Sequence, residues 1–297
     1  MHVRAKIFFV LFAAAIAGIA VAGSMLVLAH EEKVILAQAE NGAGNVAPQA
    51  GPPPAPALPE RIIWKADGAA MVRVAAGPFM MGGVRNENEK PRRSVTLPGY
   101  YIDQTEVSFG RYLRFCKETG RRPPVSILTM QTVPESVMAL PAANVSWDDA
   151  DAYCKWAGKL LPGEAEWEKA CAGPSGREYP WGNGWNGSVC TNRTNSGDHA
   201  TPVGSRPGCK SPYGAMDLGG NVWEWTADWY QAYPGSKLNF DMTGTERVVK
   251  GGSFFYSIYL LRCADRYHLP PDDISDQNGF RCVVTPGKDF KDRIGVP

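Results

Sequence analysis

The pattern of hydrophobic and polar positions sets the first thirty residues apart from the rest of the chain. An uncharged apolar run extends from Ile7 to Ala29 and follows the basic residues Arg4 and Lys6. As a helix this run would be about 34 Å long, enough to cross a bilayer with the basic end in the cytoplasm. Residues 1–30 are therefore predicted to be an N-terminal transmembrane anchor. A signal peptide cleaved after Ala20-Val21-Ala22 is the alternative, and either interpretation makes the remaining chain extracytoplasmic.

The residues after the apolar run divide into a spacer, one domain and a tail. Residues 31–60 are rich in alanine, glycine, proline, glutamine and asparagine, a composition that cannot bury a core. We expect a semi-rigid spacer there. Hydrophobic periodicity then extends over one domain at 61–287, and a short polar tail at 288–297 follows.

Alternating positions predict several short strands. The alternating segments lie at 71–74, 77–82, 95–102, 247–250, 260–265 and 279–284, with a turn predicted inside the segment at 95–102. Glycine, proline, asparagine and aspartate separate them, as is typical of strands joined by loops.

Hydrophobic positions with helical spacing predict three helices. They begin after Ser108, after Ser146 and at Glu164, and they end near Gly120, Gly158 and Gly173. Serine is a favoured N-cap, and glycine is the usual residue just beyond a helix. Almost no helical periodicity follows Gly173. The fold class predicted from these elements is α+β, with an unusually large share of irregular chain.

Charge and cysteine content narrow the possible functions. The net charge of +1 gives no electrostatic reason to expect a nucleic acid partner. Seven cysteines would be unusual in a reducing compartment, and they agree with the extracytoplasmic location that the N-terminal segment predicts.

The stretch from Asp217 to Trp225 concentrates unusual residues. Two glycines, two tryptophans and two carboxylates lie within its sequence DLGGNVWEW. Carboxylates separated by a folded-back loop, whose carbonyl oxygens can turn inward, are typical of calcium sites. A glycine turn with two core tryptophans is the alternative, and the residues alone do not decide between them.

Several further motifs occur in a fixed order. They are GPFMMG at 77–82, VSWDDADAYCKWAG at 145–158, LPGEAEWEKA at 161–170, YPWG at 179–182, TPVG at 201–204, the Asp217 to Trp225 stretch, KGGS at 250–253 and GFRC at 279–282. In this order they resemble the formylglycine-generating enzymes, also called sulfatase-modifying factors. The resemblance implies a C-type-lectin-like fold with little regular secondary structure.

The resemblance also implies how the cysteines pair. By the positions of the family's cysteines, Cys154 pairs with Cys282 and Cys171 with Cys263. The remaining loop cysteines, Cys190 and Cys209, are a plausible third pair. Cys116 is left over on the inner face of a predicted helix, where we expect a small buried hydrophobic residue.

The family's oxidase chemistry uses two further cysteines, which hold copper(I) as thiolates. Alignment on Ser253 places Tyr256 and Leu261 at those positions, and no cysteine lies between Cys209 and Cys263. Since only Cys116 is spare, a copper site with two thiolates cannot form, and no copper is expected.

Calcium is the metal that the resemblance implies. The first site would use the side chains of Asp217 and Glu224 and the carbonyl oxygens of Gly220 and Val222. A second site would use Asn192 and Asp198. Oxygen ligands of this kind suit calcium, which we expect to have a structural role.

The family's substrate cleft has counterparts at Trp223, Ser253, Tyr256 and Arg266. Each has a structural alternative, such as a core tryptophan or an arginine paired with a carboxylate. The domain has only His199 and His268, which excludes a site of three histidines for iron.

These observations lead to one main hypothesis and two alternatives. The main hypothesis is a membrane-tethered extracytoplasmic binding or accessory module without copper, with a peptide or protein as its possible partner and the membrane bound through the N-terminal helix. An oxidoreductase with different chemistry in the same cleft, like the relatives that mature pyoverdine, is the first alternative. A structural subunit of a membrane-anchored complex is the second.

Overall fold

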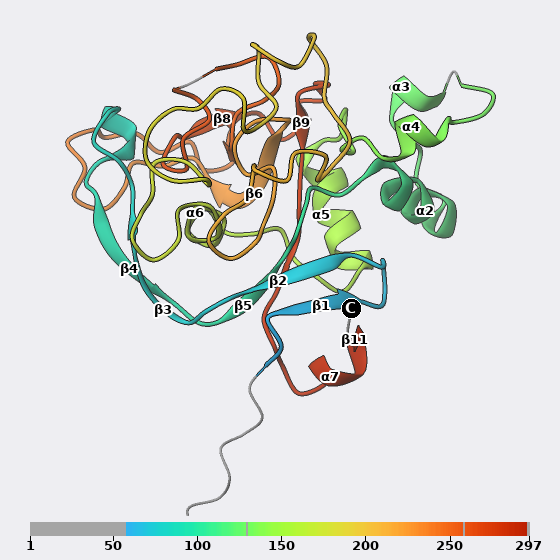
Figure 1. The fold of residues 1–297 in the computed structure, drawn as a ribbon, viewed down its shortest axis with the longest axis horizontal. Helices are drawn as coiled ribbons and strands as arrows, with labels where there is room; N and C mark the ends of the chain where they lie inside the picture. The colour runs from blue at the N-terminus through green and yellow to red at the C-terminus, as the bar shows by residue number, and fades with distance from the viewer. Residues whose placement is uncertain (1–57, 129, 258, 296–297) are drawn as a thin grey trace, which may run out of the picture. The chain divides into compact units, whose positions relative to one another are not determined.

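The computed structural model describes residues 58–128, 130–257 and 259–295 (Figure 1). The predicted membrane anchor and almost all of the predicted spacer lie outside these residues. Within the described part of the chain, no helix is long and apolar enough to cross a membrane. The described residues belong to one compact unit that begins at Leu58.

The first sheet has five antiparallel strands in the order β10-β5-β2-β1-β11. Its strands are β1 (Arg61–Trp64), β2 (Ala70–Val74), β5 (Tyr100–Asp103), β10 (Val283–Val284) and β11 (Ile294–Gly295). The register places Val72 opposite Ile102. All four residues of β5 are buried, because the sheet is covered on both faces at this strand.

The remaining strands form two smaller sheets. β3 (Gly77–Met81) pairs with β4 (Arg93–Leu97), and the short helix η1 (Glu87–Glu89) lies in the loop between them. The third sheet has the order β8-β7-β6-β9. Its strands are β6 (Trp223–Trp229), β7 (Arg247–Lys250), β8 (Tyr267–Leu269) and β9 (Asn278–Gly279), and the pair of β6 with β9 is parallel.

The helices are α2 (Phe109–Thr119), α3 (Val125–Leu128), α4 (Glu135–Met138), α5 (Trp147–Trp156), α6 (Glu164–Ala172) and α7 (Phe290–Arg293). The predicted caps are present. The Ser108 side chain accepts a hydrogen bond from the amide of Arg111, and Ser146 forms a capping box with Asp149. Figure 1 shows α2, α3 and α4 together on one side of the domain.

Two predicted strands differ in the structure. The predicted strand at 260–265 is wrong, because this segment consists of turns, one of them closed by the amide of Asp265 and the carbonyl of Arg262. The segment predicted as one strand at 279–284 contains the ends of two separate strands, β9 and β10. In both segments a buried arginine, Arg262 or Arg281, turns toward distant carboxylates, and this interrupts regular pairing.

The C-terminal residues, predicted as a polar tail, form part of the packed domain. β11 pairs with β1, and Phe290 of α7 is buried against Trp64 and Tyr101. A single phenylalanine among charged residues was too weak a signal to predict this contact.

Disulfides stabilise the domain, and the Cys190–Cys209 bond closes a loop within the long irregular segment between α6 and β6. The three predicted pairs are present, with Cα–Cα distances of 5.8 Å for Cys154–Cys282, 5.6 Å for Cys171–Cys263 and 4.9 Å for Cys190–Cys209. The first two close chain separations of 128 and 92 residues. In the loop-entropy treatment each such closure stabilises the fold by about 4–5 kcal/mol.

A buried cluster of charges joins the first sheet to α5. The Lys159 ammonium lies 2.7 Å from a carboxylate oxygen of Asp67 and 2.7 Å from one of Asp103. The Tyr153 hydroxyl donates a further hydrogen bond to Asp67. None of the three charged side chains is more than 1% exposed, so each depends on its partners for solvation.

Substitution of Lys159 by alanine is expected to lower the free energy of unfolding by about 3–5 kcal/mol, since it leaves two buried carboxylates without their counter-ion. Urea denaturation of the full-length chain measures the loss. Lys155→Ala is the matched control: Lys155 pairs with Asp151 but is 64% exposed, and its loss should cost under about 1 kcal/mol. Equal losses in the two variants would contradict the prediction.

Candidate functional site

The structure places the motif residue Glu224 at the centre of a buried ion pair. Arg281 donates to both carboxylate oxygens of Glu224, with distances of 2.6 Å from Nε to Oε2 and 2.7 Å from Nη2 to Oε1. The Trp167 indole nitrogen donates a third hydrogen bond to Oε2 at 2.8 Å. Arg281 also donates to the carbonyl oxygen of Met216, one residue before Asp217. Arg281 and Trp167 therefore already bind the oxygens that the calcium prediction requires of Glu224.

The other motif carboxylate, Asp217, lies beside a residue that sequence analysis missed. Asp217 accepts a hydrogen bond of 2.6 Å from the amide of Gly204. Glu106 is fully buried, and its pKa is raised well above the ordinary value, first by burial and then by the negative charge of Asp217. Asn221 donates to Glu106 Oε1 at 3.0 Å, whereas Oε2 has no partner among the described residues.

The backbone conformation of the motif explains why position 220 is glycine and position 221 is asparagine, since both residues have positive φ angles. Gly220 has a φ of +111°, and a side-chain carbon there would lie 2.0 Å from the carbonyl oxygen of Thr191. The backbone N–H of Asn221 then donates to that same carbonyl oxygen. The loop of the Cys190–Cys209 disulfide thus packs directly on the motif, and only glycine permits this approach.

The carboxylates of Asp217 and Glu106 could still serve as calcium ligands. Within the described part of the chain, no group of three or more His, Cys, Asp and Glu side chains forms a metal site. Asp217 and the unpartnered oxygen of Glu106 nevertheless provide hard ligands in a buried place, which suits a cation that also takes carbonyl oxygens. Nothing near the end of β5 in the sequence marks Glu106, because its neighbours come from distant segments.

The second predicted calcium site is less suited to a metal in this conformation. The Asn192 amide oxygen accepts two hydrogen bonds from Thr194, and its nitrogen donates to the carbonyls of Gly187 and Cys190. Asp198 is exposed on the same loop. The Asn192 side chain thus stabilises its own loop.

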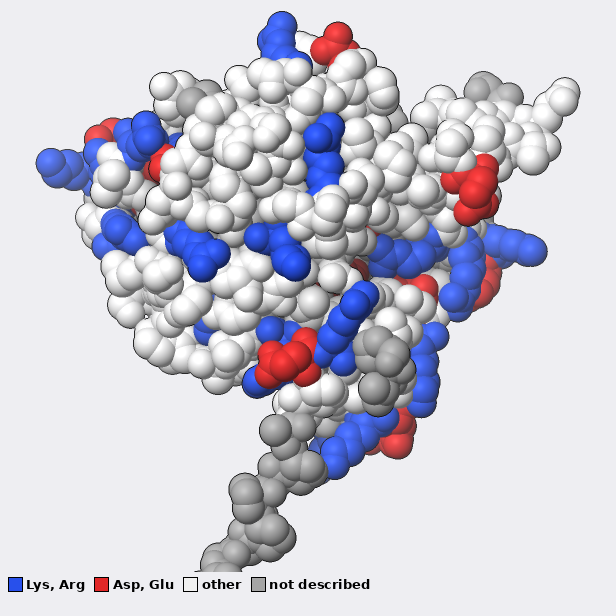
Figure 2. All heavy atoms as spheres, in the orientation of Figure 1, with Lys and Arg blue, Asp and Glu red and all other residues white. Residues whose placement is uncertain are grey.

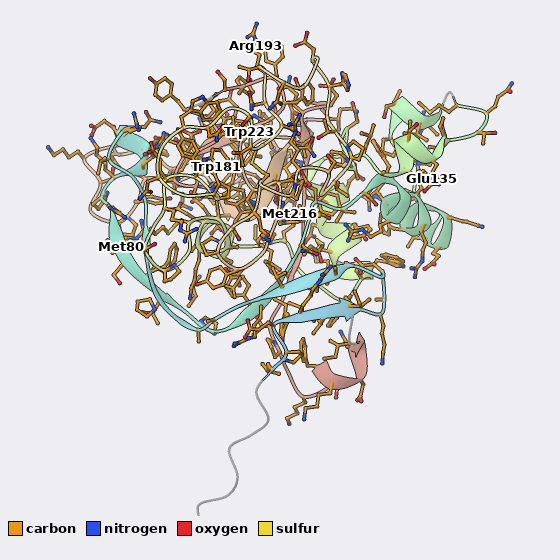
Figure 3. All side chains as sticks on the ribbon, in the orientation of Figure 1. Met80, Glu135, Trp181, Arg193, Met216 and Trp223 are labelled. Carbon is orange, nitrogen blue, oxygen red and sulfur yellow. A yellow bond between two sulfur atoms is a disulfide. The ribbon has the colours of Figure 1, made fainter. Side chains whose placement is uncertain are left out.

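The predicted cleft residues separate into two groups. Trp223, only 3% exposed, contacts the edge of Tyr256 with ring centroids 5.9 Å apart and stacks on Tyr267 at 5.4 Å. Ser253 is fully buried, and its hydroxyl donates to Gln277. The labelled Trp223 lies among the loops of the domain in Figure 3, far from the helical extension that carries Glu135.

Arg266 belongs to another network. Its guanidinium donates to both oxygens of Glu164, at 2.6 and 3.0 Å, and lies over the ring of Tyr233. No hydrogen bond, ion pair or ring contact joins Arg266 to Trp223, Ser253 or Tyr256 in the described structure. This arrangement corresponds to the structural alternative for Arg266, an arginine paired with a buried carboxylate.

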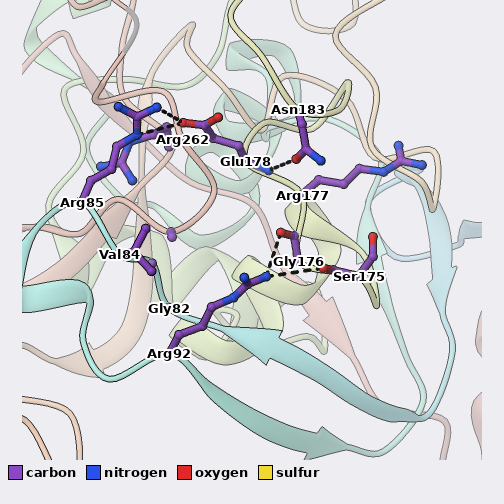
Figure 4. Close-up of a pocket in the computed structure, with 12 residues that line it drawn as sticks. Gly82, Val84, Arg85, Arg92, Ser175, Gly176, Arg177, Glu178, Asn183 and Arg262 are labelled. Atoms are coloured by element: carbon purple, nitrogen blue, oxygen red, sulfur yellow. Dashed lines mark hydrogen bonds and ion pairs between the residues drawn. The ribbon is translucent and has the colours of Figure 1, made fainter.

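An arginine-lined hollow lies on another part of the domain (Figure 4). Its volume is about 680 Å³, and its lining includes Arg85, Arg92, Arg177, Arg262 and Glu178. Nothing in the sequence predicts this site, because its arginines are separated by up to 177 positions, from Arg85 to Arg262. Arg85 also lies over the ring of Tyr259, which connects the hollow to the segment after Ser253.

Comparison with known proteins identifies the family. The Sulfatase-modifying factor enzyme 1-like domain matches residues 61–286. The chain belongs to this family. Formylglycine-generating enzyme of Mus musculus is 33% identical over 279 residues, covering 72% of this chain and 74% of the relative. The Inactive C-alpha-formylglycine-generating enzyme 2 of Mus musculus is 31% identical, covering 79% and 92%.

Solved structures share the fold of this sulfatase-modifying factor homologue. PvdO from Pseudomonas aeruginosa has a TM-score of 0.63 at 23% identity, covering 76% of this chain and 98% of that protein. Treponema denticola variable protein 1 has a TM-score of 0.63 at 21% identity, covering 73% and 95%. At these identities the likeness concerns the fold alone.

Asp265 is a buried carboxylate next to the hollow. Burial raises its pKa to about 6, although Arg262 lowers it, and its Oδ2 atom has no partner among the described residues. Because the folded-state pKa exceeds the unfolded value of 3.8, the folded state holds this proton more tightly. The contribution of Asp265 to stability therefore falls as the pH rises through about 4 to 6.

The variant Asp265→Asn is expected to lack this dependence. Relative to the variant, the wild-type chain should lose about 1 kcal/mol of unfolding free energy between pH 5 and pH 7.5. Urea denaturation at the two pH values measures the difference. Asp272→Asn, an exposed carboxylate on a loop, serves as the control. If the unfolding free energy of the wild-type chain instead rose with pH relative to that of the variant, the predicted direction would be wrong.

Proposed function

We propose that this sulfatase-modifying factor homologue is an extracytoplasmic binding or accessory module that does not perform copper-dependent formylglycine generation. One observation carries the proposal. Six of the seven cysteines are engaged in disulfides, and the seventh, Cys116, is buried in α2. Burial raises the pKa of Cys116 to about 11, which disfavours the thiolate that would bind copper or react. No pair of thiolates is available.

The residues near the family's copper positions support binding. Tyr256 contacts Trp223, and the neighbouring aromatic residues are partly exposed: Phe255 to 40%, Tyr259 to 56% and Tyr267 to 43%. Large aromatic side chains with exposed faces are typical of sites that bind peptides or proteins. The similarity to a relative named as inactive also supports a binding function without formylglycine generation.

An oxidoreductase with different cleft chemistry is the second candidate. The contact between Tyr256 and Trp223 favours it, because two oxidisable rings meet beside the family's reaction site. This alternative requires turnover of a substrate, whereas the binding module requires none.

The disulfides support an extracytoplasmic location, since such bonds persist in oxidising compartments. Attachment to the membrane through residues 1–30 is part of the proposal and rests on the sequence of that segment. A structural subunit of a membrane-anchored complex would use the same attachment.

The full-length chain is expected not to convert the cysteine of a Cys-x-Pro-x-Arg peptide to formylglycine when supplied with copper(I) and oxygen. Mass spectrometry of the peptide is the measurement, and a formylglycine-generating enzyme is the positive control. Conversion by the full-length chain at a comparable rate would overturn the proposed function.

Calcium binding at Asp217 is part of the same proposal. Asp217 and Glu106 would hold the ion together with the carbonyl oxygens of Gly220 and Val222. The unpartnered Glu106 oxygen supports this ligand set, in which Glu106 takes the place predicted for Glu224. The ion would neutralise buried negative charge and fix the motif loop, without a role in catalysis.

Saturating calcium is expected to raise the thermal midpoint of the wild-type chain by about 5 °C or more relative to excess chelator. Glu106→Gln should abolish most of this difference, because glutamine cannot supply the carboxylate that forms when calcium displaces the proton of Glu106. Glu135→Gln, at an exposed position on α4, should retain it. Differential scanning calorimetry measures the thermal midpoints. If the chelator leaves the midpoint of the wild-type chain unchanged, the motif does not depend on calcium.

A further inference from the structure

The arginine-lined hollow contains more positive charge than the protein itself balances. Arg262 is paired with Glu89 and Asp265, both buried, so its charge is compensated beneath the surface. Arg85 pairs with Glu178 at 2.8 Å. These two arginines are therefore not available as full charges for a ligand.

Arg92 and Arg177 remain without a carboxylate partner. Arg92 donates only to the carbonyl oxygens of Ser175 and Gly176, at 3.5 and 3.3 Å. The Arg177 side chain has neither a hydrogen bond nor an ion pair within the described part of the chain, and Figure 4 draws no interaction for it. Two uncompensated guanidinium groups thus lie at one hollow of a chain whose net charge is only +1.

The backbone keeps Arg92 against the turn that carries Arg177. Gly176 has a φ of +67°, and a side-chain carbon there would lie 2.6 Å from Arg92 Nη2 and 3.0 Å from the carbonyl oxygen of Met80. Any other residue would push Arg92 away. Glycine at 176 therefore permits the close approach of Arg92 to this turn.

The surroundings favour a small ligand. Figure 2 shows basic side chains spread over the face in view, separated by uncharged surface and with acidic side chains beside several of them. The net charge of +1 likewise gives no electrostatic reason to expect a nucleic acid. The volume of about 680 Å³ is typical of sites for small molecules. The planar fork of a guanidinium group matches the oxygen pairs of phosphate and sulfate.

We propose that this hollow binds a small ligand through a phosphate or sulfate group, held by Arg92 and Arg177. Asn183 is at the same wall: its side-chain oxygen accepts from the Glu178 amide, and its side-chain nitrogen is directed to no partner in the described structure. This proposal rests on the proposed binding function and adds the chemical class of the ligand. It does not depend on the outcome of the formylglycine assay, which tests chemistry at another place.

Isothermal titration of the full-length chain with inorganic phosphate, inorganic sulfate and phosphoserine tests the proposal, at constant ionic strength, with acetate as a singly charged comparison. We expect saturable binding of at least one of the doubly charged oxyanions. Arg177→Gln and Arg92→Gln should each weaken it about tenfold, since each removes a charge-assisted hydrogen bond. Comparison of phosphoserine with the free ions shows whether an ester or the ion itself is the better ligand.

Two further variants separate specific binding from general charge effects. Arg122→Gln removes the same charge at an exposed position outside the hollow and should change the affinity less than about twofold. Glu178→Gln removes the competing carboxylate and releases Arg85, so it should tighten binding. This opposite effect cannot arise from misfolding.

Absence of saturable binding in the wild-type chain would overturn the proposal. Equal weakening by Arg122→Gln and Arg177→Gln would do the same, because it would show that only the overall charge matters. Acetate binding as tight as phosphate binding would also count against it.

Discussion

The buried pair of Glu224 and Arg281 is the interaction on which the rest of this domain depends. It joins β6 to the segment that carries Cys282, and Trp167 of α6 donates to the same carboxylate. Arg281 also donates to the carbonyl oxygens of Asp103, at the end of β5, and of Met216, just before the motif. Removal of one partner of such a pair costs about 3–5 kcal/mol, because the other charge stays buried.

A fold with so little regular structure needs this kind of connection. Irregular backbone must find hydrogen-bond partners outside helices and sheets, and here buried side chains and other loops provide them. Lys159 with its two carboxylates, Glu164 with Arg266, and Glu89 with Arg262 repeat the arrangement at three more places. Disulfides hold the remaining long loops. The stability of the domain is therefore distributed over buried charges and covalent links as well as over the aromatic core.

Several side chains that resemble site residues have structural roles in this domain. The cysteines stabilise the fold, and Glu224 and Arg266, which resemble residues of sites, serve as partners in buried ion pairs. The exposed features of the described residues include a group of aromatic rings around Tyr256 and a hollow with two arginines that lack acidic partners. Both features favour recognition of a ligand.

Local chemistry in the sequence determined the three longest helices, α2, α5 and α6, and the strands β2, β3, β4, β5 and β7. Ser108 and Ser146 cap helices by contacts within three residues, so their start sites could be predicted from neighbours alone. The ordered motifs also determined the family and the pairs Cys154–Cys282 and Cys171–Cys263, and the cysteine count determined the lack of a spare pair.

Only the tertiary structure decided which charged side chains meet. Arg262 finds Glu89 across 173 positions, and this contact is part of the reason that the predicted strand at 260–265 does not form. Glu106 meets Asp217, and Arg92 meets the turn before Arg177, across loops that have no periodic pattern. Caps and alternation act over a few residues and can be recognised in sequence, whereas pairing of buried charges depends on how distant segments fold together.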